Sequence, residues 1–215
     1  MRKPHGLPGK LIVIDGGEAV GKGTQIAMLK LVLPLLYPGR TFIFSHEPGG
    51  TPLADEMYAL FKKGMRTASA HTQLCLVVGS RFDHVEKEIL PALERGDVVV
   101  LDRFEGSTSA YQVSAPGIDD LLPLFLAHQQ FVPAPDITLI LEVPVEAAIV
   151  RLAQRKGQEV SAFDQGTREF HERVRQGFRR YAEHHAGHRC VFVDGYRHPD
   201  EVREELLRHI DSVLS

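Results

Sequence analysis

Hydrophobic and polar positions divide the chain into short apolar runs and longer segments with helical spacing. Five apolar, β-branched runs predict strands that are covered on both faces: 11–15, 41–45, 97–102, 136–143 and 190–194. Between these runs, apolar residues recur every three to four positions over 22–37, 72–94, 145–155, 168–185 and 199–213. Strands that alternate with helices indicate crossover connections and a mostly parallel sheet. The pattern therefore predicts an α/β fold.

The organisation of the chain predicts one domain over residues 1–215, because no repeat and no long linker divides it. The polar, glycine-containing stretch 157–167 is the one segment expected to form a mobile flap. Hydrophobic residues make up 43% of the chain and charged residues 25%, as is typical of a globular protein.

Charge and cysteine content narrow the function classes. A formal net charge of -3 argues against a general nucleic-acid binder. The two cysteines, Cys75 and Cys190, lack the spacing of a zinc site and indicate a reducing compartment. No apolar run approaches the roughly 20 residues of a membrane span. We therefore expect a cytoplasmic protein without a membrane or nucleic-acid partner.

A glycine-rich segment, GGEAVGKGT at 16–24, lies between the first predicted strand and the first predicted helix. Gly16, Gly21 and Lys22 have the spacing of a phosphate-binding loop. Glycines allow backbone N–H groups to turn toward phosphate oxygens, and the start of the helix adds a positive dipole end. Gly23 stands where this pattern usually has a hydroxyl residue, so Thr24 is the expected magnesium ligand, directly or through water.

Three further segments follow predicted strands or lie in the long helix: HEPGGTPLADEM at 46–57, SRFDHV at 80–85 and DRFEGSTSAYQ at 102–112. Parallel sheets bind ligands at the carboxyl ends of their strands, so these segments are expected to gather around the loop. Together with the loop, they resemble thymidylate kinases, P-loop enzymes that transfer the γ-phosphate of ATP to dTMP. The resemblance runs in order through nearly the whole chain.

The resemblance implies an overall architecture and an assembly. The expected fold is the P-loop kinase three-layer α/β/α arrangement, with a five-stranded parallel sheet in the order 2-3-1-4-5 and flanking helices. A small lid at about 155–168 would fold over ATP. The family also implies a homodimer whose interface includes the helix 72–94.

The donor side of the site follows from the same resemblance. The implied ATP-binding residues are Gly16, Gly17, Glu18, Ala19, Val20, Gly21, Lys22, Gly23, Thr24, Arg151 and Arg155. Magnesium would be held by Thr24 and by Asp102, which acts through water. The implied catalytic residues are Lys22, Arg103, Glu18 and Arg155.

The acceptor side is implied in the same way. The residues expected to bind dTMP are His46, Glu47, Pro48, Val77, Arg81, Arg103, Ser107, Thr108, Tyr111 and Gln112. Arg103 would hold the phosphate, since a guanidinium binds phosphate through paired donors. Arg81 would meet the edge of the thymine, and Tyr111 would lie under the deoxyribose and crowd out a 2′-hydroxyl. Glu18 would approach the 3′-hydroxyl.

Several positions depart from the family pattern. His46 replaces the usual arginine, Val77 replaces a phenylalanine that stacks on the base, and Ala162 replaces a lid arginine. The loop residues Ala19 and Val20 carry no charge that would substitute for that arginine. These departures leave two alternatives open: a kinase for another nucleoside monophosphate or deoxynucleoside, and a catalytically weak nucleotide-binding relative.

Overall fold

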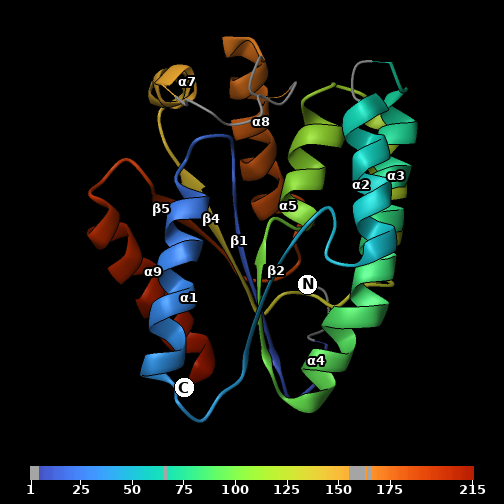
Figure 1. The fold of residues 1–215 in the computed structure, drawn as a ribbon. Coiled ribbons are helices and arrows are strands. Elements are labelled where there is room, and N and C mark those ends of the chain that lie inside the picture. The colour runs from blue at the N-terminus through green and yellow to red at the C-terminus, as the bar shows by residue number, and fades with distance from the viewer. Residues whose placement is uncertain (1–4, 65–66, 155–162, 164–165) are drawn as a thin grey trace.

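A computed structural model describes residues 5–64, 67–154, 163 and 166–215 of the chain. Within these residues the strands form one parallel sheet in the order β2-β3-β1-β4-β5 (Figure 1). The strands are β1 (Lys10–Gly16), β2 (Phe42–His46), β3 (Val98–Asp102), β4 (Ile137–Glu142) and β5 (Cys190–Asp194). The predicted fold class and strand order are confirmed.

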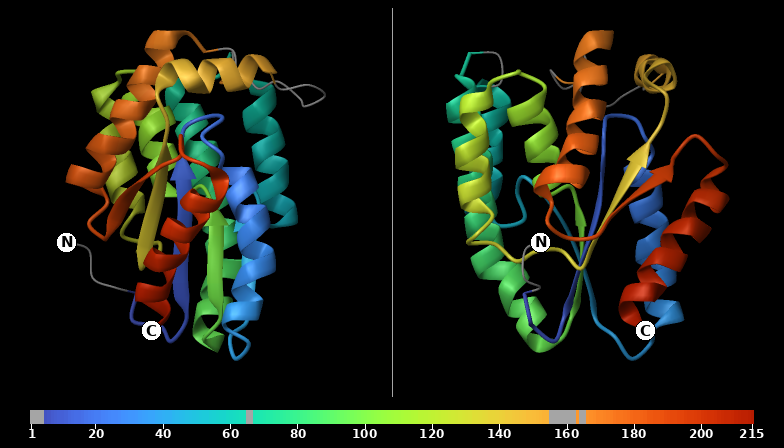
Figure 2. Two further views of the ribbon diagram at one scale, coloured as in Figure 1. Left: turned by 90° about the vertical axis from the view of Figure 1, so that its left-hand side faces the viewer. Right: turned by 180° about the vertical axis from the view of Figure 1, so that it is seen from behind.

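Helices cover both faces of the sheet and complete three layers (Figure 2). Their bounds are α1 Lys22–Leu36, α2 Pro52–Gly64, α3 Ala70–His84, α4 Leu90–Arg95, α5 Glu105–Thr108, α6 Leu122–His128, α7 Val145–Gln154, α8 Arg168–Arg180 and α9 Pro199–Leu214. Helices α1 and α9 pack on one face, whereas α3 to α5 and α8 pack on the other. The helices α2, α5 and α6 were not among the predicted elements.

The predicted helix 72–94 is one continuous helical segment with a wide turn inside it. α3 passes into the π-helical turn Val85–Ile89 and then into α4. The amide of Leu90 bonds to the carbonyl of Val85, five residues earlier, just before Pro91. Proline has no N–H and its ring collides with the carbonyl four residues before it, so the wider turn accommodates Pro91 without ending the helix.

Alternate residues of each strand supply two separate cores. Ile12 and Ile14 of β1 pack beneath α1 and α9, whereas Leu11 and Val13 face the helical segment α3–α4. All four side chains are fully buried. Because both faces are covered, the strands are apolar along their whole length, as the uninterrupted runs in the sequence predict.

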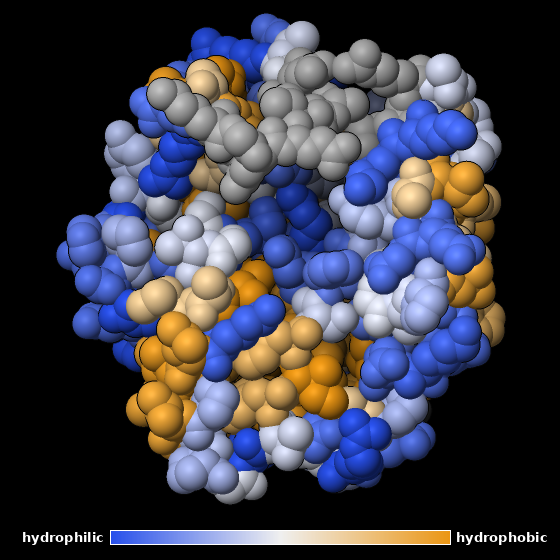
Figure 3. All heavy atoms as spheres, in the orientation of Figure 1, coloured by the Kyte–Doolittle hydropathy of each residue, from blue (hydrophilic) through white to orange (hydrophobic). Residues whose placement is uncertain are grey.

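Strand register brings the predicted segments to one edge. Ile14 of β1 pairs with Asp102 of β3, and Asp102 also pairs with His46 of β2. The chain therefore leaves these three strands at one level, beside the glycine-rich loop. Figure 3 shows a hollow with many hydrophilic side chains in the upper half of this view. Among the described residues, no helix has both the length and the apolar character to cross a membrane.

Candidate active site

The glycine-rich loop has a backbone that only small residues permit. Gly16 and Gly21 adopt φ values of 137° and 101°, and a Cβ at Gly16 would lie 2.3 Å from the carbonyl oxygen of Leu141. Ala19 also has a positive φ, 55°. Helix α1 begins directly after Gly21, so its first amides face the loop. The loop thus has the form of a phosphate cradle.

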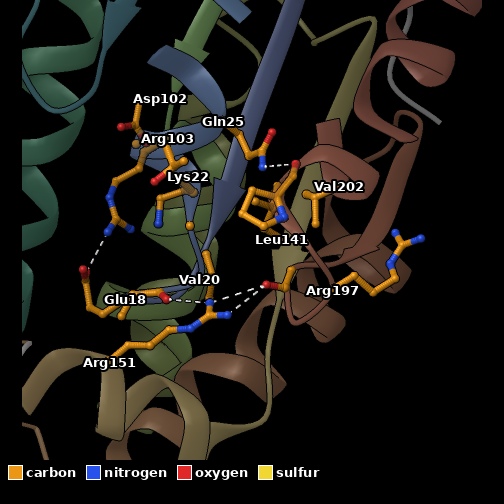
Figure 4. A pocket seen from close by; sticks show the side chains of 16 residues that line it. Glu18, Val20, Lys22, Gln25, Asp102, Arg103, Leu141, Arg151, Arg197 and Val202 are labelled. Atoms are coloured by element: carbon orange, nitrogen blue, oxygen red, sulfur yellow. Dashed lines mark hydrogen bonds and ion pairs between the residues drawn. The ribbon is translucent and has the colours of Figure 1, made fainter. Parts of the chain in front are cut away.

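A cavity of about 590 Å³, named here the P-loop cavity, opens at this loop. Its walls come from the loop, the end of β3, α7 and the β5–α9 connection: Glu18, Ala19, Val20, Gly21, Lys22, Gly23, Thr24, Gln25, Asp102, Arg103, Leu141, Arg151, Gly195, Arg197, Pro199 and Val202 (Figure 4). Gly16 and Gly17 lie behind this wall and face Lys22 with their carbonyls.

Lys22 is buried at the floor of the P-loop cavity. Its Nζ donates to the carbonyl oxygens of Gly16, at 2.9 Å, and Gly17, at 2.6 Å. Burial lowers the pKa of Lys22 to about 8; the charge of Arg103 adds to this effect, and the carboxylate of Glu18 opposes it. A bound anion would raise this pKa again and so keep Lys22 charged at higher pH.

Arg103 occupies a strained backbone position at the end of β3, with φ 67°. Its Nη2 donates to Glu18 Oε1 at 2.6 Å and its Nη1 donates to Ser107 Oγ at 3.0 Å. Burial opposes the charge, yet Glu18 holds the pKa of Arg103 above its ordinary value. Figure 4 shows the contact that joins Arg103 to Glu18 of the loop. Arg103 therefore remains a cation inside the site.

Asp15, which the sequence analysis did not single out, fixes the segment that carries Arg103. It is fully buried, and its carboxylate accepts from the Ser107 amide at 2.9 Å, the Ser107 hydroxyl at 2.6 Å and the Gly16 amide at 2.9 Å. Burial raises its pKa, and the Ser107 hydroxyl opposes that shift. The sequence feature that could have indicated this role is an acidic residue at the end of an otherwise apolar predicted strand.

A second cavity, of about 180 Å³ and named here the Tyr111 cavity, lies on the other side of the Glu18–Arg103 pair. It is lined by Glu18, Glu47, Pro48, Tyr58, Phe61, Lys62, Val77, Arg81, Arg103, Phe104, Ser107, Thr108, Tyr111, Gln112 and Phe163. The predicted acceptor residues all line it except His46, which is exposed and lines neither cavity.

The aromatic walls of the Tyr111 cavity were largely missed. Tyr58 and Phe61 come from α2, Phe104 follows the strained Arg103, and Phe163 lies in the predicted lid. The Phe163 ring centroid is 4.8 Å from that of Tyr111. Because helix α2 was not predicted, the sequence did not indicate that its side chains Tyr58 and Phe61 would line a cavity.

Arg81 is held deep in the wall of the Tyr111 cavity, with 1% of its surface exposed. Its Nε donates to Glu47 Oε2 at 2.6 Å, and its Nη2 donates to Thr108 Oγ1 at 2.9 Å. The guanidinium also lies over the ring of Phe104, at 4.7 Å from the centroid. These contacts fix Arg81 as a rigid, charged part of the cavity wall.

Tyr111 connects the two cavities through its hydroxyl, which donates to Glu18 Oε1 at 3.0 Å. Burial raises the pKa of Tyr111, and the neighbouring Glu18 carboxylate raises it further. Arg103 lies over the same ring, with its guanidinium carbon 5.4 Å from the centroid. Tyr111 is therefore a neutral hydrogen-bond donor whose ring face borders the cavity.

The predicted lid is only partly described. Arg151 of α7 lines the P-loop cavity and donates to the carbonyl oxygens of Ala19 at 3.2 Å and Gly195 at 3.3 Å (Figure 4). Arg155 and Ala162 lie outside the described residues. On the far wall, Arg197 and other residues of the β5–α9 connection had not been predicted to take part.

The carboxylate of Asp102 in the P-loop cavity is suited to a metal cation that takes most of its ligands from phosphates and water. Asp102 Oδ1 is buried and has no hydrogen-bond partner among the described residues, and Thr24 lines the same cavity. In the part of the chain that the structure describes, no group of three or more His, Cys, Asp or Glu side chains forms a metal site. Thr24 and Asp102 fit a Mg²⁺ ion that takes its other ligands from phosphate and water.

Comparisons with known proteins agree on one family. The sequence model described as "Thymidylate kinase" matches residues 14–206. A thymidylate kinase of Gluconobacter oxydans is 36% identical over 210 residues, which is 96% of both chains. One of Bradyrhizobium sp. is 38% identical over 200 residues, covering 90% of this chain and 86% of its own. A crystal structure of the Ehrlichia chaffeensis thymidylate kinase superposes with a TM-score of 0.74 at 28% identity and covers 94% of this chain and 98% of its own.

Proposed function

The chain belongs to the thymidylate kinase family, and from that premise we propose that it transfers the γ-phosphate of ATP to dTMP, giving dTDP and ADP, between its two cavities. The observation that supports this most directly is the shared wall: Glu18 and Arg103 line both the P-loop cavity and the Tyr111 cavity. A donor in one cavity and an acceptor in the other would meet at these two side chains. Phosphoryl transfer requires such an arrangement.

ATP would lie in the P-loop cavity with its phosphates on the loop. The amides from Gly21 to Thr24 and the start of α1 would bind the phosphate oxygens. Lys22 would turn from the carbonyls of Gly16 and Gly17 to the outer phosphates, whose negative charge would raise its pKa again. Arg151 lies beside the loop at a place suited to the adenosine end.

The monophosphate would lie in the Tyr111 cavity with its phosphate toward Arg103. Arg81 and Thr108 would meet the base, and the Tyr111 ring would border the sugar. Glu18, whose carboxylate already accepts from Tyr111 at 3.0 Å, would accept from the 3′-hydroxyl. Val77 offers no aromatic face to the base, but Phe61 and Phe104 line the same cavity and supply apolar surface.

The reaction needs positioning and charge neutralisation more than a general base. A phosphate monoester is already largely anionic at neutral pH, so its oxygen attacks without losing a proton to the enzyme. Arg103 would hold this oxygen in line, and Lys22 would bind the charge that develops on the transferred group. Arg155 would add positive charge from the lid.

Mg²⁺ bound through Thr24 and Asp102 would neutralise part of the charge on the phosphates of ATP. The unpartnered Asp102 Oδ1 supports this assignment, because a buried carboxylate oxygen is otherwise costly. Equilibrium dialysis with ATP and Mn²⁺ as a probe measures it, and Asp102→Asn should weaken metal uptake by the ATP complex.

We further propose a cytoplasmic homodimer, as the family resemblance implies. Leu53 and Leu60 of α2 and Phe131 after α6 expose 44%, 58% and 72% of their surfaces and would supply apolar area to a second copy of the chain. Sedimentation velocity measures the assembly state directly, and a single species of monomer mass at micromolar concentration would contradict the dimer.

Lys22→Ala should lower the turnover of dTMP about 10²- to 10³-fold, because one fixed positive charge on the transferred phosphate is lost. The measurement is ADP release with ATP and magnesium over dTMP, dUMP, dCMP and AMP. Lys30→Ala is the matched control, since Lys30 lies on the same helix, is exposed and lines neither cavity.

The same assay separates the competing functions. Wild-type protein that prefers another monophosphate to dTMP would identify the substrate that Val77 favours. Wild-type protein that binds ATP but releases no ADP with any of the four acceptors would contradict the kinase assignment and favour a nucleotide-binding role. Near-normal turnover by Lys22→Ala would exclude the mechanism given above.

A further inference from the structure

His128, at the end of α6, contacts the guanidinium of Arg81, which lines the Tyr111 cavity. Its Nε2 lies 3.0 Å from Arg81 Nη1, and only 3% of its surface is exposed. The two residues are 47 positions apart in the sequence, and His128 does not line the cavity itself. His128 therefore contacts a residue of the cavity wall without lining the cavity that would hold the acceptor.

The hydrogen bonds of His128 determine its tautomer. Its Nδ1 lies 2.5 Å from the carbonyl oxygen of Phe125, which can only accept, so Nδ1 carries a proton. Nε2 is then an acceptor in the neutral ring, and Arg81 can only donate to it. The Glu105 carboxylate is 3.9 Å from Nε2, too far to compete for the same direction. His128 is thus oriented as a hydrogen-bond acceptor for Arg81.

The bond to His128 completes a set of contacts that fixes the orientation of Arg81. A guanidinium has five N–H groups. Glu47 accepts from Nε, His128 from Nη1 and Thr108 from Nη2, so each nitrogen has one fixed bond. One N–H on Nη1 and one on Nη2 have no partner among the described residues. With all three nitrogens held, the guanidinium plane cannot rotate, so the directions of these two N–H groups are fixed.

We propose that His128 is a positioning residue for the acceptor: it holds Arg81 so that two N–H donors face the Tyr111 cavity and select a pyrimidine with a carbonyl at position 4. The inference rests on the proposed function, since it assumes that dTMP binds in this cavity. Thymine and uracil place an acceptor oxygen at position 4. Cytosine places an amino group there, which would set N–H against N–H and leave buried donors unpaired.

The test compares two substitutions at one position. In His128→Gln, the amide oxygen can accept from Arg81 while the amide nitrogen donates to Phe125. In His128→Leu, the shape is roughly kept and both hydrogen bonds are lost. Gln130→Ala is the matched control, because Gln130 is exposed, lies two residues further on and lines neither active-site cavity.

We expect His128→Leu to raise the KM for dTMP about tenfold or more, as the loss of a hydrogen bond to a charged group does. The preference for dTMP over dCMP should fall in the same variant. The KM for ATP and the turnover at saturating dTMP should change much less, and His128→Gln should restore most of the KM and of the preference. A general loss of folding would instead lower turnover with every substrate.

Each outcome has one meaning. A His128→Leu variant that keeps the wild-type KM for dTMP and the wild-type preference would overturn the positioning role while leaving the kinase assignment intact. A rise in the KM for ATP equal to that for dTMP would also overturn it. If the leucine variant does not fold, His128→Asn takes its place, because its shorter side chain cannot reach Arg81. Wild-type protein inactive on dTMP would overturn the proposed function itself.

Discussion

At the scale of single residues, two cations line the P-loop cavity in different surroundings. Lys22 is buried and Arg103 is partly buried, yet their surroundings act in opposite directions. Burial lowers the pKa of Lys22, whereas Glu18 keeps Arg103 charged despite burial. Lys22 is therefore the residue whose charge depends on the conditions and on the ligand.

This difference predicts a pH dependence. Lys22 must be protonated to bind phosphate, and its pKa in the free protein is about 8, so kcat/KM for ATP should fall as the pH rises through about 8. Bound phosphates favour the charged form, so kcat should fall only at higher pH. Initial rates from pH 6.5 to 10 measure both limbs.

Lys22→Arg is the control for that profile, because a guanidinium stays charged over the whole range and should remove the fall above pH 8. Arg103 contributes to the lowered pKa, so Arg103→Ala should move the fall to higher pH. A profile of kcat/KM that stays flat to pH 10 in the wild type would contradict a role for the Lys22 charge.

Individual residues differ in how far the sequence could identify them. The loop residues were predictable because a fixed spacing between a strand and a helix specifies them. Asp15 and His128 were not, since each acts on a residue far away in the sequence, and only folding brings the partners together. His46 was expected at the acceptor because of its neighbours in the sequence, but β2 ends with its side chain exposed.

At the scale of elements, two helices contain π-helical turns beside the acceptor. The first, Val85–Ile89, follows the α3 turn that carries Arg81, and the second, Ser109–Ser114, includes Tyr111. In a π-helical turn, one more residue fits into each turn, which redirects the side chains. The second turn packs tightly on α8: a Cβ at Gly177 would lie 2.8 Å from the Ala110 Cα.

Gly177→Ala should therefore destabilise the protein by about 1–2 kcal/mol, because the overlap with the backbone outweighs the usual gain from replacing a helical glycine. The displaced turn carries Tyr111, so the KM for dTMP should rise as well. Urea denaturation and steady-state kinetics measure the two effects.

Gly79→Ala on α3 provides the comparison. The nearest atom to its added Cβ would be Met57 Sδ at 3.5 Å, an ordinary contact, so this variant should gain about 0.5–1 kcal/mol from helix propensity. Equal stabilisation by both alanines would show that the approach of α8 to Ala110 is not restrictive.

The long elements could be predicted and the short ones could not. The strands and the longer helices carry clear periodicity. In α2 only Ala54 and Phe61 are buried, so its apolar pattern is weak, and glycines and prolines before it suggest a loop. One local signal was present, since the Thr51 hydroxyl accepts from the Ala54 amide at the start of α2, as at a helix N-terminus.

At the scale of the whole molecule, the two cavities lie at the same edge of one sheet, so a ligand in either one should stabilise the fold. Saturating dTMP at about a hundred times its Kd should stabilise the protein by about 2.7 kcal/mol, which corresponds to a rise in Tm of about 5–10 °C for a chain of this size. A non-hydrolysable ATP analogue should add a further rise. In Lys22→Ala the rise with the analogue should shrink while the rise with dTMP stays.

Differential scanning calorimetry with each ligand alone and with both measures these shifts. A loss of the dTMP shift in Lys22→Ala would contradict the separation of the two cavities. The fold itself was predictable at this scale because family resemblance gave the strand order. The arrangement of the cavities was not, since it depends on side chains from many separate segments that meet around Glu18 and Arg103.

The border between the cavities includes two side chains, Glu18 and Arg103, which line both cavities and are joined by one 2.6 Å contact. A single inhibitor could therefore occupy both cavities, with a thymidine group in the Tyr111 cavity, an adenosine group in the P-loop cavity and a polyphosphate tether between them. Tethering makes the second docking step intramolecular, so avidity gains of about 10²–10⁴ are attainable where the tether spans the gap. The tether length that gives the highest affinity would measure the distance between the bound donor and acceptor.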